Sequence, residues 1–402
     1  MTNLHDVLRG TSAIATDATV GLIDLVEHLH ATIGDRPGPF GRAPRGTTRG
    51  LTGIVYRILR GATRAVGRGA SFGLGSLGTL VPDIEPGRDL EAFIGVLNGV
   101  HGDYLERTAN PLAIAMGFRQ EGRPVDPAAL GPAPATGKLL VMVHGLCLTD
   151  LHWRREGHDH GRRLSREHGY TPLYLYYNSG LHVFENGRRL AALLEELAGR
   201  WPVPVEEIAI LGHSMGGLVA RSACHYGRLA GHAWPARLGR MAFLGTPHHG
   251  APLERGGNRL NFLLDLSPYS APFTRLGRAR SAGITDLRYG NLCDEDWRGR
   301  DRFGLGPDPR RPVPLPPGVE CYLLAAVRGK RRGPISDRLV GDGLVPLDSA
   351  LGRHARPGLN LSVPASHQSV CYGTGHLELL GSRTVYAQLS RWFAGAPARS
   401  AS

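Results

Sequence analysis

The sequence predicts an α/β fold with a doubly wound, mostly parallel sheet covered by helices on both faces. Continuous apolar runs such as Leu139–Val143 have the composition of strands buried on both faces. Amphipathic segments such as 183–200 alternate with these runs, and a helix between successive strands is typical of a parallel sheet. The length of 402 residues and the apolar fraction of 42% allow one large domain with an additional region.

We interpret residues 138–395 as one domain that contains the whole sheet. The strands are expected at 139–143, 170–177, 208–211, 241–244 and 319–327, and the helices at 154–168, 183–200, 215–228 and 377–393. Residues 250–318 break the alternation with many Gly, Pro and Arg residues. We predict a lid-like insertion there, with a disordered loop as the alternative.

A separate helical region is predicted ahead of this domain, over residues 1–120. Apolar residues recur there at helical spacing, for example between Leu22 and Ile33. A shorter helix is expected around Phe93–Leu97. Residues 121–137 are rich in Pro, Ala and Gly, which indicates a linker to the domain at 138–395.

One segment of the N-terminal region, residues 52–68, has a basic face and an apolar face. On a helical wheel four arginines share one side: Arg57, Arg60, Arg64 and Arg68. This pattern is typical of a helix that lies on a membrane surface. Our hypothesis is that it docks on an anionic membrane or lipid granule; the alternative is that its apolar face packs on the main domain.

The chain is basic, with 47 Lys and Arg residues against 35 Asp and Glu residues and a formal net charge of +12. Nearly all of these cations are arginines, since the lysines are Lys138 and Lys330 alone. Codon usage in a GC-rich genome and attraction to an anionic surface both explain such a bias. No nucleic-acid recognition motif accompanies the charge, so we predict no nucleic-acid partner.

Cysteine usage and the N-terminus favour a cytoplasmic protein, which would be peripheral to a membrane if residues 52–68 dock on lipid. The five cysteines are odd in number, which argues against a disulfide framework. Asp6, Asp17 and Asp24 interrupt what would be the apolar part of a secretory signal. No apolar run reaches the length of about 18 residues that a membrane span needs.

The strongest chemical motif is Gly212-His213-Ser214-Met215-Gly216. It follows the predicted strand 208–211 directly and precedes a predicted helix, which is the context of a nucleophile elbow. Glycines at 212 and 216 would permit a tight turn that lifts Ser214 clear of the backbone at a helix N-terminus. We predict that Ser214 is a nucleophile; a glycine-rich helix start with an incidental serine is the alternative.

Acyl transfer needs two N–H groups that stabilise an oxyanion. The first is expected from Met215, which follows the nucleophile. The second is expected from the loop after the first core strand, His144-Gly145-Leu146-Cys147, and we assign it to Leu146. An ordinary loop at the end of a strand is the alternative.

The base and the acid should follow the serine in the order acid, then histidine. His376 directly precedes the last predicted helix and is the preferred base, with His367 in reserve and His354 also late enough in the chain. The preferred acid is Asp342, which two glycines flank in a predicted tight turn. Two other aspartates also follow the strand 319–327: Asp337 and Asp348.

Four motifs together resemble bacterial triacylglycerol lipases and related esterases of the α/β-hydrolase superfamily, and also its inositol-deacylase-like branch. They are Val143–Leu146, the elbow, Gly245-Thr246-Pro247-His248-His249-Gly250, and Asp342-Gly343 ahead of Gly375-His376-Leu377. The resemblance covers about residues 138–395. It implies a triad of Ser214, Asp342 and His376. The calcium ion of several secreted relatives is not carried over, because no clear acidic set is present.

The sequence therefore predicts a serine carboxylic ester hydrolase that forms an acyl-enzyme, acts on apolar acyl esters in lipid metabolism, and needs no metal or organic cofactor. An acyltransferase or thioesterase with the same triad is one alternative, because sequence does not show which nucleophile or leaving group the site admits. A non-catalytic protein that binds lipid surfaces is the other. His248 and His249 are expected either to line the site or to support it structurally.

Overall fold

The fold is described by a computed structural model, which covers residues 88–126, 135–251, 281–303, 306–308, 310–329 and 341–395. The basic segment 52–68, most of the predicted N-terminal helical region and the reserve acid Asp337 lie outside the described residues. The fold and the candidate site described here therefore lie within the C-terminal three quarters of the chain.

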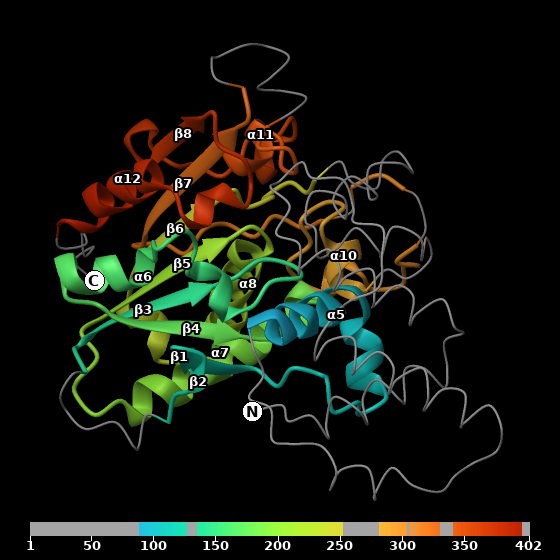
Figure 1. Ribbon diagram of the computed structural model, residues 1–402. Coiled ribbons are helices and arrows are strands. Elements are labelled where there is room, and N and C mark those ends of the chain that lie inside the picture. Colours follow the sequence, from blue (N-terminus) through green and yellow to red (C-terminus); the bar gives the residue numbers. More distant parts are fainter. Residues whose placement is uncertain are drawn as a thin grey trace, which may run out of the picture.

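The sheet has eight strands in the order β2-β1-β4-β3-β5-β6-β7-β8 (Figure 1). In chain order the strands are β1 (Gly117–Gln120), β2 (Arg123–Pro124), β3 (Lys138–Val143), β4 (Thr171–Tyr176), β5 (Glu207–His213), β6 (Leu238–Leu244), β7 (Glu320–Val327) and β8 (Gln368–Tyr372). All pairs from β4 to β8 are parallel, whereas β1 is antiparallel to both β2 and β4. The mostly parallel sheet of the prediction is confirmed.

Helices cover both faces of the sheet. They are α5 (Arg88–Arg107), α6 (His160–His168), α7 (Val183–Arg200), α8 (Met215–Leu229), α10 (Ala282–Asp286), α11 (Leu347–Ala350) and α12 (Arg383–Phe393). Several begin at polar caps that satisfy a free backbone N–H: the Asp159 carboxylate accepts from Arg162 N in α6, and the Ser382 hydroxyl from Val385 N in α12. The predicted helix 183–200 has the bounds of α7.

Successive side chains of the central strands enter two different cores. Leu139, Val141 and Val143 of β3 pack with apolar residues of α7 and α8 on one face. Leu140 and Met142 pack with residues of α6 and α12 on the other. Because both faces of β3 are buried, its residues have to be apolar on both sides. This strand therefore appears in the sequence as a continuous apolar run and not as an alternation of apolar and polar residues.

The chain reverses its winding direction at β3. The next strand, β4, pairs on one side of β3, and β5 pairs on the other. In open parallel sheets, the crevice at the carboxyl ends of the strands flanking such a reversal is where functional loops gather. Val143 and Gly212 are register partners, so the loop after β3 and the turn after β5 leave the sheet side by side.

Three features differ from the prediction. The sheet begins with β1 and β2, ahead of the predicted domain start at residue 138 and inside the region expected to be helical and linker. β8 was not predicted. The helix expected at 154–168 begins only at His160, after a turn at Asp150–Trp153. The missed strands are short and carry mixed polar residues, so hydrophobic periodicity gives no signal for them.

The helix α5 packs on the domain through its own apolar cluster. Phe93, Ile94 and Leu97 are buried together with Tyr176 of β4 and Ile284 of α10. The short helix expected around Phe93–Leu97 is thus the middle of a helix of 20 residues with a kink at His101. Within the described ranges, no helix has the length and apolar character needed to span a membrane.

Candidate active site

Ser214 lies in the sharp turn between β5 and α8. Its backbone has φ 54° and ψ −129°, a region that residues other than glycine rarely occupy. The turn is held because Ser214 N donates to Leu244 O at 2.9 Å and Gly217 N donates to Ser214 O at 3.1 Å. His213 and Met215 are fully buried, whereas Ser214 between them is partly exposed. The strained turn therefore brings this serine alone to the surface.

The glycines of this turn leave no room for side chains. A Cβ on Gly212 would lie 2.6 Å from Gly217 Cα, and one on Gly216 would lie 2.2 Å from Val143 O. A Cβ on Gly145 would lie 2.9 Å from Ser214 Cβ. The first two approaches are to backbone atoms, and the third is to a Cβ atom bonded directly to the backbone, so none of them can be relieved by turning a flexible side chain. They explain physically why glycine occupies each of these positions.

His376 and Asp342 form a buried pair at the carboxyl edge of the sheet. His376 Nδ1 lies 2.6 Å from Asp342 Oδ2. The other carboxylate oxygen, Oδ1, accepts from Leu344 N at 2.9 Å and from Val345 N at 2.8 Å. Because a carboxylate only accepts, the imidazole carries its proton on Nδ1 and leaves Nε2 free to accept another.

The pair is held together by the loops that follow β7 and β8. Arg328 N donates to Gly341 O at 2.8 Å and Thr374 N donates to Val327 O at 3.2 Å, which anchor the two loops at the end of β7. His376 N then donates to Asp342 O at 3.1 Å. Backbone contacts therefore fix the relative position of the two residues independently of their side chains.

Two contacts place this pair beside the Ser214 turn. The rings of His376 and His213, the residue before Ser214, have centroids 4.8 Å apart, and His213 Nε2 lies 3.1 Å from His376 O. Gly245 follows Leu244, which holds Ser214 N, and a Cβ on Gly245 would lie 3.0 Å from Asp342 Oδ2 and 3.3 Å from His376 Nδ1. The structure thus brings Ser214, His376 and Asp342 to one place.

His213 is a neutral neighbour of His376. Burial, and next the positive charge that His376 would carry, lower the pKa of His213 well below its usual value. His213 Nε2 therefore donates to the His376 carbonyl without competing for a proton. The sequence analysis placed His213 only in the elbow and did not predict this contact.

The loop expected to supply an oxyanion donor is held from behind by two unpredicted residues. Tyr177 Oη donates to His144 O at 2.7 Å, and Ser179 Oγ accepts from Cys147 N at 3.1 Å. Both follow β4, so the strand next to β3 supports the loop that contains Leu146. Met215 is the first residue of α8, where a backbone N–H has no partner one turn earlier in the helix.

The reserve candidates lie elsewhere. His367 precedes β8 and its ring packs 4.5 Å from that of Tyr322, at the amino edge of the sheet. His354 Nε2 lies 3.7 Å from Asp308 Oδ2. Asp348 is exposed and pairs with Arg353 at 3.7 Å. Of the late residues that the structure describes, it brings only His376 and Asp342 together.

A family model described as PGAP1-like alpha/beta domain matches residues 194–290. The matched segment includes the Ser214 turn and the stretch Gly245–Gly250 after β6. No curated protein matches the sequence.

Three solved structures illustrate the similarity. The mature lipase BlEst2 of Bacillus licheniformis is 17% identical over 67% of this chain and 96% of its own, with a TM-score of 0.41. An esterase of Pyrobaculum calidifontis is 14% identical over 79% and 95%, with a TM-score of 0.40. The ester-hydrolase EH1AB1 from the metagenome of Lake Arreo is 16% identical over 84% and 96%, with a TM-score of 0.38.

The fold assignment rests on the strand order and the family match rather than on these likenesses. The strand order, the reversal at β3 and the turn between β5 and α8 agree with the predicted fold class. The chain is an α/β hydrolase in fold, and over residues 194–290 it is similar to the PGAP1-like alpha/beta domain family.

Proposed function

We propose that the protein is a serine hydrolase that cleaves carboxylic esters through an acyl-enzyme. Ser214 is the nucleophile, His376 the general base and Asp342 the residue that orients the imidazole. The single observation that supports this most is the 2.6 Å contact of His376 Nδ1 with Asp342, made beside the strained turn of Ser214.

In the first half of the reaction, Ser214 Oγ attacks the ester carbonyl carbon while His376 Nε2 takes its proton. The carbonyl oxygen becomes an oxyanion and accepts from the N–H groups of Leu146 and Met215. Losing one such donor typically costs about 3 kcal/mol of barrier. The imidazolium then gives its proton to the leaving alcohol, and the acyl group stays on Ser214.

In the second half, water attacks the acyl-enzyme. His376 Nε2 takes a proton from the water and returns it to Ser214 Oγ as the carboxylic acid leaves. Asp342 holds the ring in one tautomer throughout, and its two backbone donors keep the carboxylate in place. The side chains that this scheme needs are all on loops at one edge of the sheet.

Two other functions use the same geometry differently. An acyltransferase or thioesterase would share the triad and differ in the acceptor or leaving group. A lipid-surface binding protein would have no use for the strained turn, which costs about 1–3 kcal/mol to maintain. That strain favours an enzyme over a binding protein.

The proposal is tested with p-nitrophenyl esters of increasing acyl length, with and without detergent. We expect hydrolysis by the wild type and a loss of about 10⁴-fold or more in Ser214→Ala. Ser362→Ala, which changes an exposed serine outside the site, serves as the control and should keep the full rate. Equal rates for Ser214→Ala and Ser362→Ala would contradict the proposal.

The membrane hypothesis is retained as a separate proposal about residues 52–68. A deletion up to residue 137 would also remove α5 and β1, which pack in the domain, so substitutions in the full chain are the better test. We expect the quadruple change of Arg57, Arg60, Arg64 and Arg68 to Gln to reduce co-sedimentation with anionic liposomes. Unchanged pelleting would rule out docking through this segment.

A further inference from the structure

Arg221 of α8 is a buried arginine that has no anionic partner among the residues that the structure describes. Its side chain donates to Val313 O at 2.6 Å, and its Nη1 lies 3.2 Å from His248 Nδ1. Its Nε has no hydrogen-bond partner, and no carboxylate among the described residues pairs with it. Arg221 is 5% exposed, so water outside the protein does not solvate the charge.

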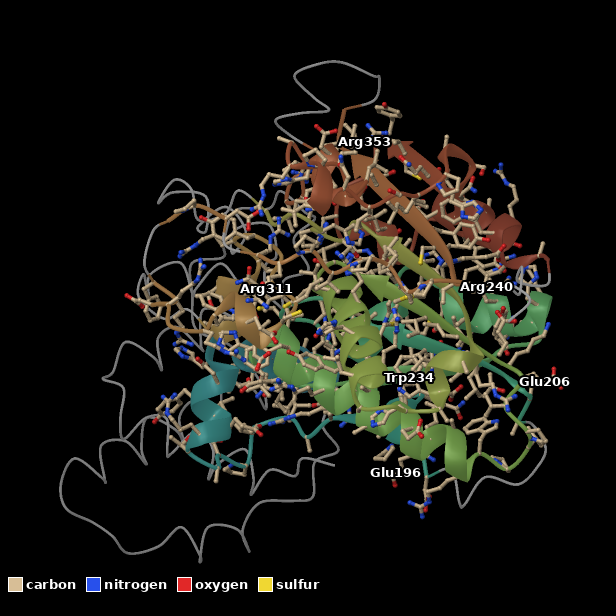
Figure 2. All side chains as sticks on the ribbon, turned by 180° about the vertical axis from the view of Figure 1, so that it is seen from behind. Glu196, Glu206, Trp234, Arg240, Arg311 and Arg353 are labelled. Carbon is tan, nitrogen blue, oxygen red and sulfur yellow. The ribbon has the colours of Figure 1, made fainter. Side chains whose placement is uncertain are left out.

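The other buried arginines with known partners show what this protein usually does with such a charge. Arg240 lies 3.0 Å from Glu207 and 3.9 Å from Glu320 in the sheet (Figure 2). Arg119 lies 3.3 Å from Glu91 and 3.5 Å from Asp150. Each of these cations has two carboxylates. An unpaired buried charge costs several kcal/mol, so the lack of a carboxylate beside Arg221 in the described part of the chain needs an explanation.

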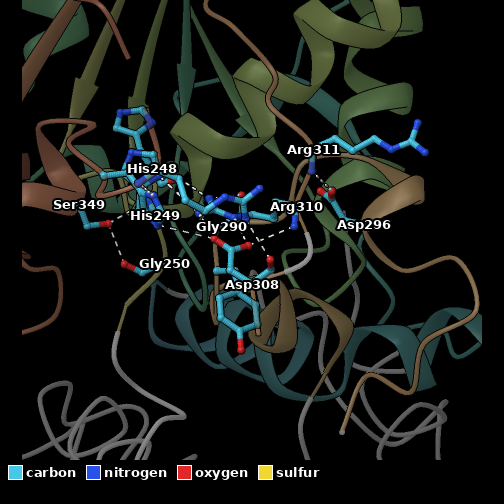
Figure 3. Close-up of polar contacts among 12 residues, drawn as sticks. His248, His249, Gly250, Gly290, Asp296, Asp308, Arg310, Arg311 and Ser349 are labelled. Carbon is cyan, nitrogen blue, oxygen red and sulfur yellow. Dashed lines mark hydrogen bonds and ion pairs between the residues drawn. The ribbon is translucent and has the colours of Figure 1, made fainter. Parts of the chain in front are cut away.

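Arg221 faces a cavity of about 80 Å³ beside a second buried arginine. Arg310 lines the same cavity and donates to His248 O at 2.8 Å (Figure 3). Arg221 contacts the ring of the same histidine, so two guanidinium groups lie against His248. A single water needs only about 10–15 Å³ of such volume. The cavity therefore has room for several heavy atoms, which is more than a single halide ion requires.

The carboxylates near the cavity already accept hydrogen bonds from groups other than Arg221. Asp308 Oδ2 accepts from Arg310 Nη2 at 2.8 Å and its Oδ1 from Arg310 Nε at 3.0 Å. Asp296 also lines the cavity, but its oxygens accept three backbone N–H groups: Leu292 N at 2.9 Å, Cys293 N at 3.1 Å and Arg311 N at 3.1 Å. Neither aspartate forms an ion pair with Arg221.

Arg221 keeps its positive charge at neutral pH. Burial and next the charge of Arg310 lower its pKa to about 10, which is still far above pH 7. The same environment lowers the pKa of His248 well below its usual value, first through burial and then through Arg221, so His248 adds no charge of its own. Of the two buried guanidinium groups at the cavity, that of Arg221 is the one without an ion-pair partner among the described residues.

We propose that this cavity binds a small tetrahedral oxyanion, of the phosphate or sulfate type, on the Arg221 guanidinium and beside the positive charge of Arg310. Guanidinium groups offer planar pairs of N–H donors that match the oxygens of such an anion. The bound anion would supply the negative charge that Arg221 lacks. It would also join α8 to the segment 310–314 and to the stretch after β6, so its main effect would be on stability.

This site is separate from the proposed ester chemistry. Arg221 is seven residues after Ser214 on α8, which places it about 10 Å further along the helix. A failure of the serine mechanism would not affect anion binding, and an empty cavity would not affect the serine mechanism. The two proposals are therefore distinguished by stability and activity measurements.

The test is thermal unfolding of the full chain at constant ionic strength, with sodium gluconate replaced stepwise by phosphate or sulfate. We expect the Tm of the wild type to rise by about 3 °C or more as the site fills. Glycerol phosphate is a third arm. A matching rise would favour a phosphate carried on an organic group, whereas a rise with inorganic ions alone would favour the free ion.

Matched variants show whether the rise in Tm depends on the cavity. Arg221→Met and Arg310→Met should lose the rise in Tm. Arg228→Met removes the same charge from an exposed position of α8 that does not line the cavity, and should keep it. If the Tm of the wild type does not rise when phosphate or sulfate replaces gluconate, the proposal is overturned, whatever the variants do.

A second measurement does not depend on whether the variants fold. Diffraction from wild-type crystals grown with selenate, whose selenium scatters anomalously, should show a peak in the cavity with its oxygens within hydrogen-bond distance of the Arg221 guanidinium. A well-ordered cavity that contains only water under these conditions would also contradict the proposal.

Discussion

His376 and His248 are both buried beyond the ends of strands, yet their surroundings are opposite. The Nδ1 atom of His376 meets a carboxylate, Asp342, at 2.6 Å. The Nδ1 atom of His248 meets a guanidinium, Arg221, at 3.2 Å. A carboxylate only accepts and a guanidinium only donates, so the first ring is protonated on Nδ1 and the second accepts there and carries its proton on Nε2.

The comparison shows that the partner of Nδ1 decides what a buried imidazole can do. His376 has Nε2 free to accept a proton, and the positive charge that results is stabilised by Asp342. A proton on His248 would place a second positive charge beside Arg221 in a buried site. Residue type is the same and burial is similar in both places, and the neighbouring charge is what distinguishes the proposed base, His376, from His248.

The largest expected effect comes from removing the carboxylate that distinguishes His376. In Asp342→Asn the amide occupies the same space, but it no longer holds the ring in the required tautomer. We expect kcat for ester hydrolysis to fall by about 10⁴-fold, as in other serine triads. Asp348→Asn is the control, because that carboxylate is exposed and six residues further along the chain. Similar kinetics for the two variants would contradict the assignment of the acid.

The environment of His248 predicts that acid lowers the stability of the fold. The folded-state pKa of His248 lies below its unfolded value, so below about pH 6.5 the unfolded chain binds more protons and the free energy of unfolding falls. His144 and His160, whose pKa burial lowers to about 3, act in the same direction. At pH 5 each such imidazole contributes about 2 kcal/mol of this loss.

Denaturant unfolding of His248→Asn at several pH values measures how much of this loss of stability is due to His248. Asparagine keeps an acceptor near Arg221 and does not titrate. We expect the variant to be less stable than the wild type at pH 7 but to lose about 2 kcal/mol less between pH 7 and pH 5. Parallel stability curves for the two proteins would mean that His248 is not held neutral.

A smaller effect is expected from crowding the His376 and Asp342 pair. In Gly245→Ala the new Cβ would lie 3.0 Å from Asp342 Oδ2 and 2.8 Å from Leu379 Cδ1, at a residue with φ +56°. We expect kcat to fall by about tenfold, because misplacing a catalytic group by a fraction of an ångström already costs rate. Gly231→Ala has a similar φ of +67° and open space around it, so it controls for backbone strain. Equal losses in both variants would assign the effect to strain alone.

Much of the fold could be predicted because its signals are local. The apolar run of β3, the helical spacing of α7 and the glycines around Ser214 each come from neighbouring residues. The Asp342 and His376 loops could be ranked by chain order and by their glycines. β1 and β8 could not be found in this way, since a short strand with polar residues is formed by its partners in the sheet rather than by its own pattern.

The cavity at Arg221 lay beyond the reach of sequence reasoning for a different reason. Its two arginines are 89 positions apart, one in a helix whose other arginine, Arg228, is largely exposed and one inside the segment expected to be a lid. In the sequence, nothing distinguishes these two arginines from the many others in this arginine-rich chain. Only the packing of the segment 310–314 against α8 shows that they share one buried space.

The central claim, that Ser214 is an activated nucleophile, is tested most directly with a fluorophosphonate probe followed by mass spectrometry of the labelled peptides. The wild type and Ser362→Ala should both be labelled on Ser214, and Ser214→Ala should not be labelled. A wild type that stays unlabelled while folded, or a label on a different residue, would contradict the account.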